Sequence, residues 1–224
     1  DIIREDTLEV KDKYSDERRT RITNDASGID IEYLIADEQV VVTISHEGYI
    51  KRMPLDTYRK QGRGGRGIVG ADAKEGDFIE TLFIASTKAY LMFFTNLGRV
   101  YWQKVYDIPS LARQSKGRSI ANLLEMQPNE NLAQVLAVRD FEDEGKHLFF
   151  ATCQGVVKKT LLKAFSNVMK RGIIAIGLEQ KDRLIGVAVT NGNDQILLAT
   201  RNGMAIRFDE SDVRDMGRPA AGVA

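Results

Sequence analysis

The chain has 224 residues, of which 43% are hydrophobic and 29% charged, with 32 basic and 32 acidic side chains. This is the composition of a globular protein with a sizeable core, and apolar runs such as AYLMFF are far shorter than the roughly 20 residues of a membrane span. The single cysteine, Cys153, excludes an internal disulfide and a multi-cysteine metal site. No secretory signal is recognisable, so a cytoplasmic protein that does not contact a membrane is expected.

The acidic start of the chain is predicted to lie outside the main domain. Residues 1–38 carry twelve acidic and six basic side chains, whereas residues 39–224 carry twenty acidic and 26 basic ones. The apolar residues at the start are spaced as in a short helix that ends near the DERRT stretch: Ile2, Ile3, Leu8 and Val10. We therefore expect a helical segment with a linker over 1–24 and a separate domain over 25–224.

Four tetrads with a hydroxyl residue first and a glycine last predict four β-hairpins: SHEG, TNLG, TCQG and TRNG. Their glycines are spaced 50, 57 and 48 residues apart: Gly48, Gly98, Gly155 and Gly203. Each tetrad follows a β-branched or aromatic run and precedes a run that mixes apolar and basic residues. The predicted strands lie near residues 39–45, 49–53, 89–95, 99–104, 147–152, 155–160, 195–200 and 204–208.

Each hairpin is followed by a short helix-like stretch and a glycine-rich segment: GRGIVG, GRSIAN, GIIAIG and GRPAAG. A further strand closes the first three units: FIETLFIA, LAQVLAV and LIGVAVT. Four to five short strands in each unit of about 50 residues indicate an all-β array of antiparallel, propeller-like blades. The sequence holds three such blades and part of a fourth, so a fragment of a longer protein is expected.

The glycine-rich segment of the first unit overlaps the loop QGRGGRG, residues 61–67, which contains no apolar side chain. Its two arginines could clamp a nucleic-acid backbone, or the loop could be a solvated turn or an unstructured arginine–glycine segment. Its glycines also fit the dinucleotide motif G-x-G-x-x-G, but the β-like IVG follows them where that motif requires a helix.

Basic residues recur at equivalent places of three successive units. There are six bases and one acid in 51–67, five bases and one acid in 99–118, and five bases and no acid in 156–171. These stretches predict a continuous basic rim that could follow a polyanion, although such residues can also simply keep a strand edge soluble. The candidate rim residues are Lys51, Arg52, Arg59, Lys60, Arg99, Lys104, Arg113, Lys116, Arg118, Lys158, Lys159, Lys163, Lys170 and Arg171.

No pattern of residues indicates a catalytic centre. His46 and His147 are expected to be turn and strand-start residues, and no neighbour of Cys153 would activate its thiol. Tyr101 and Trp102 are expected to pack within a blade and not to stack on bases. No cofactor and no metal are expected.

The run of units resembles the C-terminal DNA-wrapping domain of the DNA gyrase A protein. The resemblance is carried by VVVTISHEGYIK, QGRGGRG, GRVYWQKVYDIP and RLIGVAV, and the first residues look like the join to the cleavage domain of that protein. It implies a β-pinwheel, a propeller variant in which neighbouring blades exchange strands.

The heptapeptide that defines this family, the gyrase A box Q-R-R-G-G-K-G, maps onto Gln61, Gly62, Arg63, Gly64, Gly65, Arg66 and Gly67. Two positions depart from it. Gly62 stands where the family has arginine, and the nearby Arg59 and Lys60 could supply the missing charge. Arg66 replaces lysine and favours bidentate phosphate contact.

The resemblance implies a non-catalytic domain that wraps double-stranded DNA around its rim and so enables ATP-dependent negative supercoiling by a holoenzyme. Its implied partners are the gyrase B protein and a second gyrase A protein, and ATP and Mg²⁺ would be used elsewhere in that enzyme. The alternatives are the C-terminal domain of the topoisomerase IV C protein, which lacks the box, and a propeller scaffold for protein partners.

Overall fold

The computed structural model describes residues 2–16, 20, 31–57, 76–167, 169 and 171–224. The chain divides into two compact units, Asp1–Leu34 and Ile35–Ala224. The first unit contains helices α1 (Ile2–Tyr14) and α2 (Ile31–Leu34).

Helix α1 confirms the predicted N-terminal helix. It has Glu5 in its first turn and Lys11 and Lys13 in its last turn, an arrangement that suits the helix dipole, and it buries none of its described side chains. The boundary predicted after residue 24 stays a prediction, because residues 21–30 lie outside the described residues.

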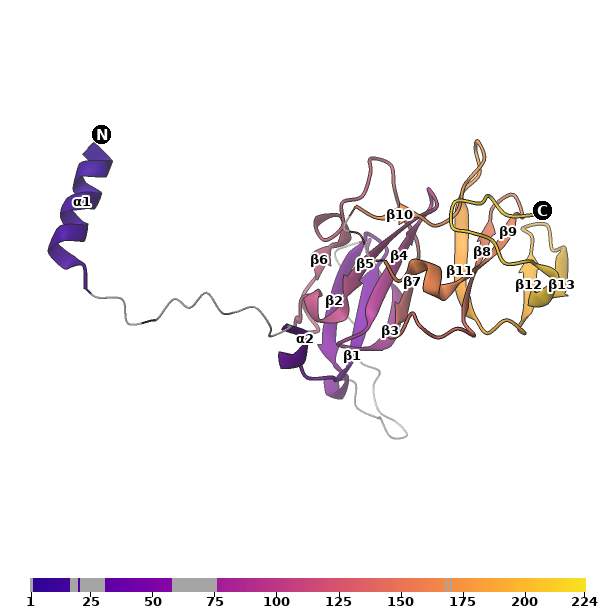
Figure 1. Cartoon of the computed structure of the whole chain (residues 1–224), viewed down its shortest axis with the longest axis horizontal. Helices are drawn as coiled ribbons and strands as arrows, with labels where there is room; N and C mark the ends of the chain where they lie inside the picture. The colour runs from indigo at the N-terminus through magenta and orange to yellow at the C-terminus, as the bar shows by residue number, and fades with distance from the viewer. Residues whose placement is uncertain (1, 17–19, 21–30, 58–75, 168, 170) are drawn as a thin grey trace. The chain divides into compact units, whose positions relative to one another are not determined.

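The second unit is a series of antiparallel sheets that we call blades 1 to 4 (Figure 1). Blade 1 has the strand order β3-β1-β2-β6, blade 2 the order β10-β5-β4-β7, blade 3 the order β11-β8-β9, and blade 4 pairs β12 with β13. The predicted hairpin strands and closing strands are confirmed. Their bounds are β1 (Gln39–Ser45), β2 (Tyr49–Pro54), β3 (Ile79–Ser86), β4 (Tyr90–Thr95), β5 (Arg99–Lys104), β6 (Arg118–Ser119), β7 (Leu132–Val138), β8 (His147–Thr152), β9 (Val157–Leu161), β10 (Ile173–Ile174), β11 (Leu184–Thr190), β12 (Gln195–Ala199) and β13 (Ala205–Asp209).

The helix-like stretches that the sequence indicates are single 3-10 turns. They span Leu55–Thr57, Val105–Asp107, Ile120–Asn122, Leu162–Phe165 and Glu210–Asp212. Four of them directly follow the outer strand of a hairpin (β2, β5, β9 and β13), and the turn at Ile120–Asn122 directly follows β6. Each of these turns ends a strand, so no long helix interrupts the series of blades in the described residues.

Each hairpin turn is built by the hydroxyl residue and the glycine of its tetrad. In the first hairpin the amide of Gly48 donates to the Ser45 carbonyl at 2.9 Å, and the Ser45 hydroxyl accepts the Tyr49 amide at 3.2 Å. In the third and fourth hairpins Thr152 and Thr200 accept the same two bonds. Their carbonyls accept the glycine amide of the tetrad and their hydroxyls accept the amide of the next residue. Gly48 has φ +79°, a left-handed conformation that explains why glycine ends the tetrad.

Neighbouring blades exchange a short strand, as the family resemblance implies. Strand β6 leaves blade 2 and pairs with β2 of blade 1, and β10 leaves blade 3 and pairs with β5 of blade 2. At the third junction Val223, which follows the hairpin of blade 4, forms a bridge with Val157 of β9. The outer strands β2, β5 and β9 are therefore covered by chain from the following blade.

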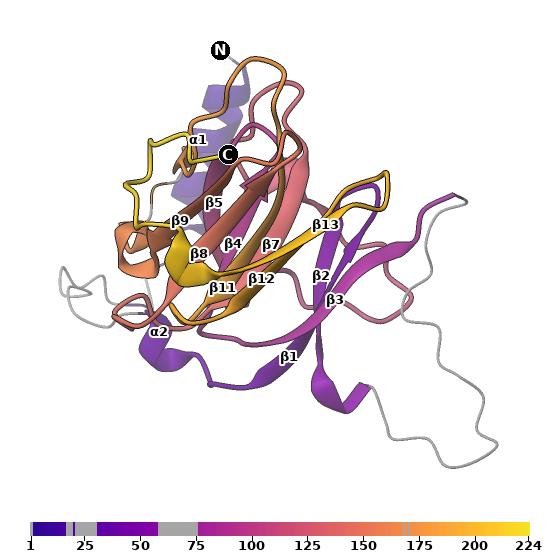
Figure 2. The same ribbon diagram turned by 90° about the vertical axis from the view of Figure 1, so that its right-hand side faces the viewer.

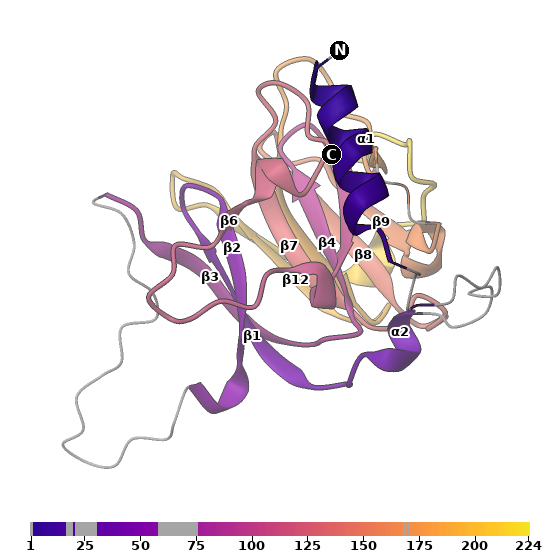
Figure 3. The same ribbon diagram turned by 90° about the vertical axis from the view of Figure 1, so that its left-hand side faces the viewer.

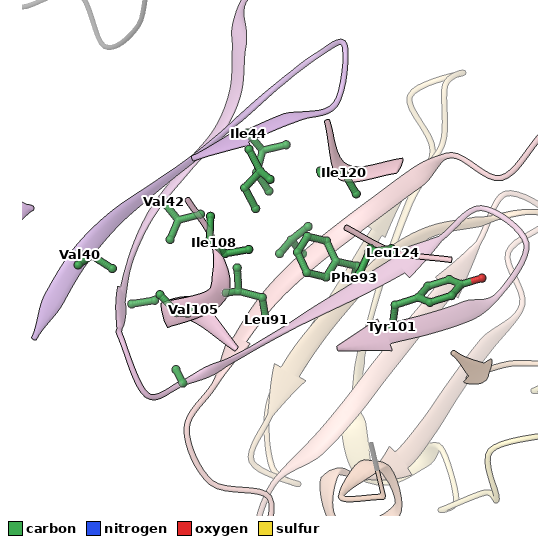
Figure 4. Close-up of a cluster of buried hydrophobic side chains, with 14 residues drawn as sticks. Val40, Val42, Ile44, Leu91, Phe93, Tyr101, Val105, Ile108, Ile120 and Leu124 are labelled. Atoms are coloured by element: carbon green, nitrogen blue, oxygen red, sulfur yellow. The ribbon is translucent and has the colours of Figure 1, made fainter. Parts of the chain in front are cut away.

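The core lies between blades, so the central strands are buried on both faces. Leu91 and Phe93 of β4 face the cluster shared with blade 1 (Figure 4), while Met92 and Phe94 face the cluster shared with blade 3. This explains the unbroken apolar run of β4, where a sheet with one wet face would alternate apolar and polar residues. Figure 2, with the β12–β13 hairpin nearest the viewer, and Figure 3, from the opposite side, show the blades stacked behind one another.

Candidate nucleic-acid interface

The chain segments that cross from one blade to the preceding one lie at the outer edges of the sheets. We call residues 109–119, 171–174 and 214–223 the first, second and third exchanged segments. The first runs beside Arg52 of β2, whose amide donates to the Pro109 carbonyl at 3.0 Å and whose carbonyl accepts the Leu111 amide at 3.2 Å. The third repeats this arrangement, because the Met216 amide donates to the Lys159 carbonyl at 2.8 Å.

A glycine lets each exchanged segment approach the outer strand closely. Gly117, Gly172 and Gly222 have φ values of +99°, +65° and +109°. A Cβ atom would lie 2.9 Å from the Ile50 carbonyl oxygen at Gly117, and 2.5 Å from the Val157 carbonyl oxygen at Gly222. Both the backbone conformation and the space therefore require glycine, which explains the glycine-rich landmarks GRSIAN, GIIAIG and GRPAAG.

The exchanged segments present most of the accessible cations of the predicted rim. Arg118 on the first and Arg171 on the second are exposed, and so is Arg214 on the third. Arg113 and Arg218 are half-buried. None of the described residues forms an ion pair with these five arginines. They are therefore available to an anionic partner.

Lys116 of the first exchanged segment is exposed and partly engaged. Its Nζ lies 3.8 Å from the centre of the Tyr49 ring and 3.8 Å from a Glu47 carboxylate oxygen. Hydrogen bonding to Tyr49 is the main cause of the raised pKa of Lys116, and the charge of Glu47 adds to it. The side chain stays cationic at any physiological pH.

Three residues of the predicted rim are buried and do not present their charge at the surface: Lys51, Lys158 and Lys159, which are 1%, 0% and 7% exposed. Lys51 and Lys158 donate to backbone carbonyls of exchanged segments. Lys159 donates to the Glu210 carbonyl at 3.3 Å and lies 3.5 Å from the Asp215 carboxylate. The expectation that these lysines line the rim is therefore corrected, because the neighbouring blade covers them.

Three further cations of the predicted rim are half-buried and bind the protein's own carbonyls. Arg52 donates to the Ile108 carbonyl at 2.7 Å and Lys104 to the Lys88 carbonyl at 3.1 Å. Arg99 donates to the carbonyl of Arg171 at 2.8 Å. These residues hold loops and junctions in place.

Lys163 is exposed and its Nζ pairs with a Glu142 carboxylate oxygen at 2.6 Å. Hydrogen bonding to Glu142, reinforced by its charge, raises the pKa of Lys163. The remaining predicted residues lie outside the described residues: the box Gln61–Gly67, with Arg59, Lys60 and Lys170.

Arg214 and Arg218 were not predicted as rim residues. The signal was available, since GRPAAG belongs to the same landmark as GRSIAN and Arg218 stands four residues before Gly222, as Arg113 stands four before Gly117. Aligning the landmarks by their exchanged glycines would have placed Arg218 on the rim, whereas Arg214 aligns with Pro109 and has no counterpart in the first segment.

The other side chains that the sequence brings forward have structural surroundings. Tyr101 and Trp102 are buried in the inter-blade clusters, as predicted for packing residues. His46 stacks on Phe78 with ring centres 4.8 Å apart, and Cys153 is exposed, with its thiol 3.2 Å from an Asp182 oxygen.

The described ranges contain no group of three histidine, cysteine or acidic residues placed to hold a metal ion. They also contain no helix long and apolar enough to cross a membrane. The chemistry that the described site offers is the binding of anions by arginine and lysine.

A series of antiparallel sheets in which blades 1 and 2 each receive a strand from the next blade and blade 3 a bridge defines a propeller-type domain of the β-pinwheel class; its exchanged segments carry arginines that form no ion pair among the described residues. The model of the family "DNA gyrase C-terminal domain, beta-propeller" matches residues 39–86, 89–139, 146–191 and 194–224. The chain belongs to this family.

Curated relatives and solved structures agree with this assignment. The chain is 47% identical to the DNA gyrase A protein of Clostridium acetobutylicum over 99% of its own length, and 47% identical to that of Salmonella typhimurium over 100% of it. It covers 27% and 25% of these relatives, so it spans about a quarter of their length.

Two solved structures share the fold. The C-terminal domain of DNA topoisomerase IV matches with a TM-score of 0.71 and 33% identity over 84% of this chain and 57% of that one. The DNA gyrase A C-terminal domain matches with a TM-score of 0.66 and 26% identity over 84% and 60%.

Proposed function

We propose that this chain is a non-catalytic DNA-binding domain that bends and wraps duplex DNA along its exchanged segments. The observation that supports this function is the recurrence of an exposed, unpaired arginine on each segment, at Arg118, Arg171 and Arg214. Because the segments belong to successive junctions, a duplex that follows them contacts one blade after another. Contacts of this kind are made to phosphates and carry little sequence information.

The stiffness of DNA explains why a repeated site is needed. Bending 20 to 30 base pairs smoothly through 40 to 90° costs roughly 1 to 6 kcal/mol, which several phosphate contacts must offset. A single basic patch would bind DNA and leave it straight, whereas patches on consecutive blades hold it on a curve. The arginines of the box, Arg63 and Arg66, are proposed as a clamp on one end of this path.

In the complete protein this domain would serve the supercoiling reaction of a DNA gyrase. It would present wrapped DNA to the cleavage domains, with the gyrase B protein and a second gyrase A protein as partners and ATP and Mg²⁺ used outside this chain. No cofactor is proposed for the domain itself, and the cytoplasm is its proposed location.

A topoisomerase IV domain is the second candidate, because the solved structure of a topoisomerase IV C-terminal domain has a TM-score of 0.71 with this chain. The heptapeptide Gln61–Gly67 favours gyrase, since the resemblance assigns the box to gyrase and its absence to topoisomerase IV.

The test is the binding of this chain to a duplex of about 30 base pairs at several salt concentrations, followed by relaxation of a closed circular plasmid in its presence. Six cations lie on the described exchanged segments: Arg113, Lys116, Arg118, Arg171, Arg214 and Arg218. If these six and the two box arginines, Arg63 and Arg66, engage phosphates, the logarithm of the affinity falls with the logarithm of salt with a slope of about −7. Trapped supercoils in the relaxed plasmid are expected in addition. A slope near zero would indicate a scaffold for protein partners, and salt-dependent binding without trapped supercoils would contradict wrapping.

A further inference from the structure

Two buried lysines occupy the same place in the repeat. Lys51 is the third residue after the hairpin glycine Gly48, and Lys158 is the third after Gly155. Both are buried, with 1% and 0% of their surface exposed. Two lysines equally buried at equivalent positions indicate a shared role, because a lysine is seldom buried without partners.

Both ammonium groups donate to the same position of an exchanged segment. The Lys51 Nζ donates to the carbonyl of Arg113 at 2.5 Å, and the Lys158 Nζ donates to the carbonyl of Arg218. These carbonyls stand four residues before the exchanged glycines Gly117 and Gly222. Lys51 also donates to the Ser115 carbonyl at 2.7 Å and Lys158 to the Ala175 carbonyl at 2.6 Å.

The junction between blades 2 and 3 holds its exchanged segment with different residues. Tyr101 occupies the position of the two lysines, and its ring packs against Gly172, where a Cβ atom would lie 2.6 Å from the ring. Arg99 donates to the carbonyls of Arg171 and Gly172 at 2.8 and 3.1 Å. The outer strands β2, β5 and β9 therefore each carry a side chain that holds the incoming segment.

The chemistry of a buried ammonium links each lysine to the docked segment. A lysine has three donors and no acceptor, and burying its charge is costly unless hydrogen bonds replace water. Here backbone carbonyls take the place of water as hydrogen-bond acceptors, and at least one of them belongs to the exchanged segment. If that segment leaves, the ammonium and the carbonyls lose each other's hydrogen bonds.

The same segments carry the exposed cations, so their position decides where those cations lie. Arg118 is five residues beyond the Arg113 carbonyl, and Arg214 is four residues before the Arg218 carbonyl. We propose that Lys51 and Lys158 are positioning residues that lock the exchanged segments onto the preceding blades and so fix the spacing between successive sets of DNA-binding cations. This proposal rests on the proposed function for its effect on wrapping, and on the structure alone for the locking itself.

Hydrogen exchange at single amides of this chain tests the locking directly. In Lys51→Met we expect the Ile120 and Leu111 amides, which donate to the Gly48 and Arg52 carbonyls, to exchange at least about tenfold faster than in the parent. In Lys158→Met the same acceleration is expected at the Val223 and Met216 amides, which donate to the Val157 and Lys159 carbonyls.

Each variant serves as the control of the other, because Lys51→Met is expected to leave the Val223 amide unchanged and Lys158→Met the Ile120 amide. Lys163→Met, which removes an exposed lysine, is expected to change neither junction. Unchanged exchange at the corresponding junction in a folded variant would overturn the proposal. A methionine variant that does not fold is replaced by leucine at the same position, which also removes the ammonium donors. Exchange as slow as in the parent would overturn the proposal there too.

The effect on wrapping is measured with the same two assays as the proposed function. Lys51→Met is expected to keep the affinity for a short duplex within about twofold, since no surface cation is removed, and to trap fewer supercoils in a relaxed plasmid. Equal numbers of trapped supercoils would overturn the link to wrapping. If the parent chain bound no DNA, the proposed function would fail while the exchange experiment still decided the locking.

Discussion

At the scale of single residues, the surroundings of a lysine decide whether its charge is offered to a partner. Lys163 keeps its ammonium at the surface beside Glu142, whereas Lys158 donates to the Ala175 carbonyl and is fully buried. The sequence predicted both as rim residues, because both stand in basic stretches of the repeat. The two lysines differ in exposure because residues near Arg218, far along the chain, cover Lys158. Burial by such a distant segment leaves no signal in the local sequence.

The burial of Lys158 predicts an unusual dependence of stability on pH. Burial, assisted by the nearby charge of Arg218, lowers the pKa of Lys158 from 10.5 to about 8. Between these two values the unfolded chain binds more protons than the folded chain, so the free energy of unfolding should rise with pH by at most about 1.4 kcal/mol per pH unit. Below pH 8 the group is protonated in both states and this dependence disappears.

Urea unfolding of the parent and of Lys158→Met at pH 7, 8.5 and 9.5 measures this contribution. Other groups titrate in both proteins, so the quantity to compare is the difference between their pH slopes. Lys163→Met is the matched control, because Glu142 raises the pKa of Lys163. Parallel pH profiles for parent and Lys158→Met would show that the burial of Lys158 does not perturb its titration.

At the scale of structural elements, the hairpins were predictable and the exchanged strands were not. A hairpin is encoded locally, by the hydroxyl of Ser45 and the left-handed Gly48 between two strand-like runs. Strand β6 has only two residues, Arg118 and Ser119, and its partner β2 lies more than sixty residues earlier in the chain. Its glycine-rich landmark was visible, but its pairing could be expected only from the family resemblance.

The glycines of these elements predict two different costs of substitution. Gly172 has φ +65° and a Cβ atom there would lie 2.6 Å from the Tyr101 ring, whereas Gly155 has φ +85° and open space around it. Gly155→Ala should cost about 1 kcal/mol for the left-handed backbone alone, and Gly172→Ala about 2 to 4 kcal/mol because the core must also shift. Denaturant unfolding of both variants checks this, and equal losses of stability would mean that Tyr101 moves aside freely.

At the scale of the whole molecule, wrapping depends on how contacts are distributed along the chain. The sequence predicted a basic rim over successive blades, and its zero net charge hid that rim because residues 1–38 carry an excess of acids. The structure buries the predicted lysines of β2 and β9 and leaves exposed cations on the exchanged segments, where Arg118, Arg171 and Arg214 lie. A linear sequence could show which stretches are basic but not which side chains the next blade covers.

Mutation of the box tests its proposed role as a clamp on one end of the DNA path. Replacing Arg63 and Arg66 by alanine should remove about two phosphate contacts and lower the magnitude of the salt slope by about 1.8. Binding to a short duplex should persist through the cations of the exchanged segments, while plasmid relaxation should trap few supercoils because the path loses its anchored end. A double variant that traps as many supercoils as the parent would assign the loop to a simple turn.

The last prediction tests whether DNA binding and wrapping depend on the cations of the exchanged segments or only on the net charge of the chain. The variant R118A/R171A/R214A removes one exposed arginine from each segment and should lower the magnitude of the salt slope by about 2.7 and abolish the trapping of supercoils. The variant R139A/K146A/R183A removes the same charge from residues outside these segments that are not candidate rim residues; Arg139 and Lys146 pair with Asp37 and Asp143, and Arg183 is exposed. It should bind and wrap like the parent, because its cations do not lie on the path. Equal losses in both variants would show that the DNA responds to net charge, and the path along the exchanged segments would have to be abandoned.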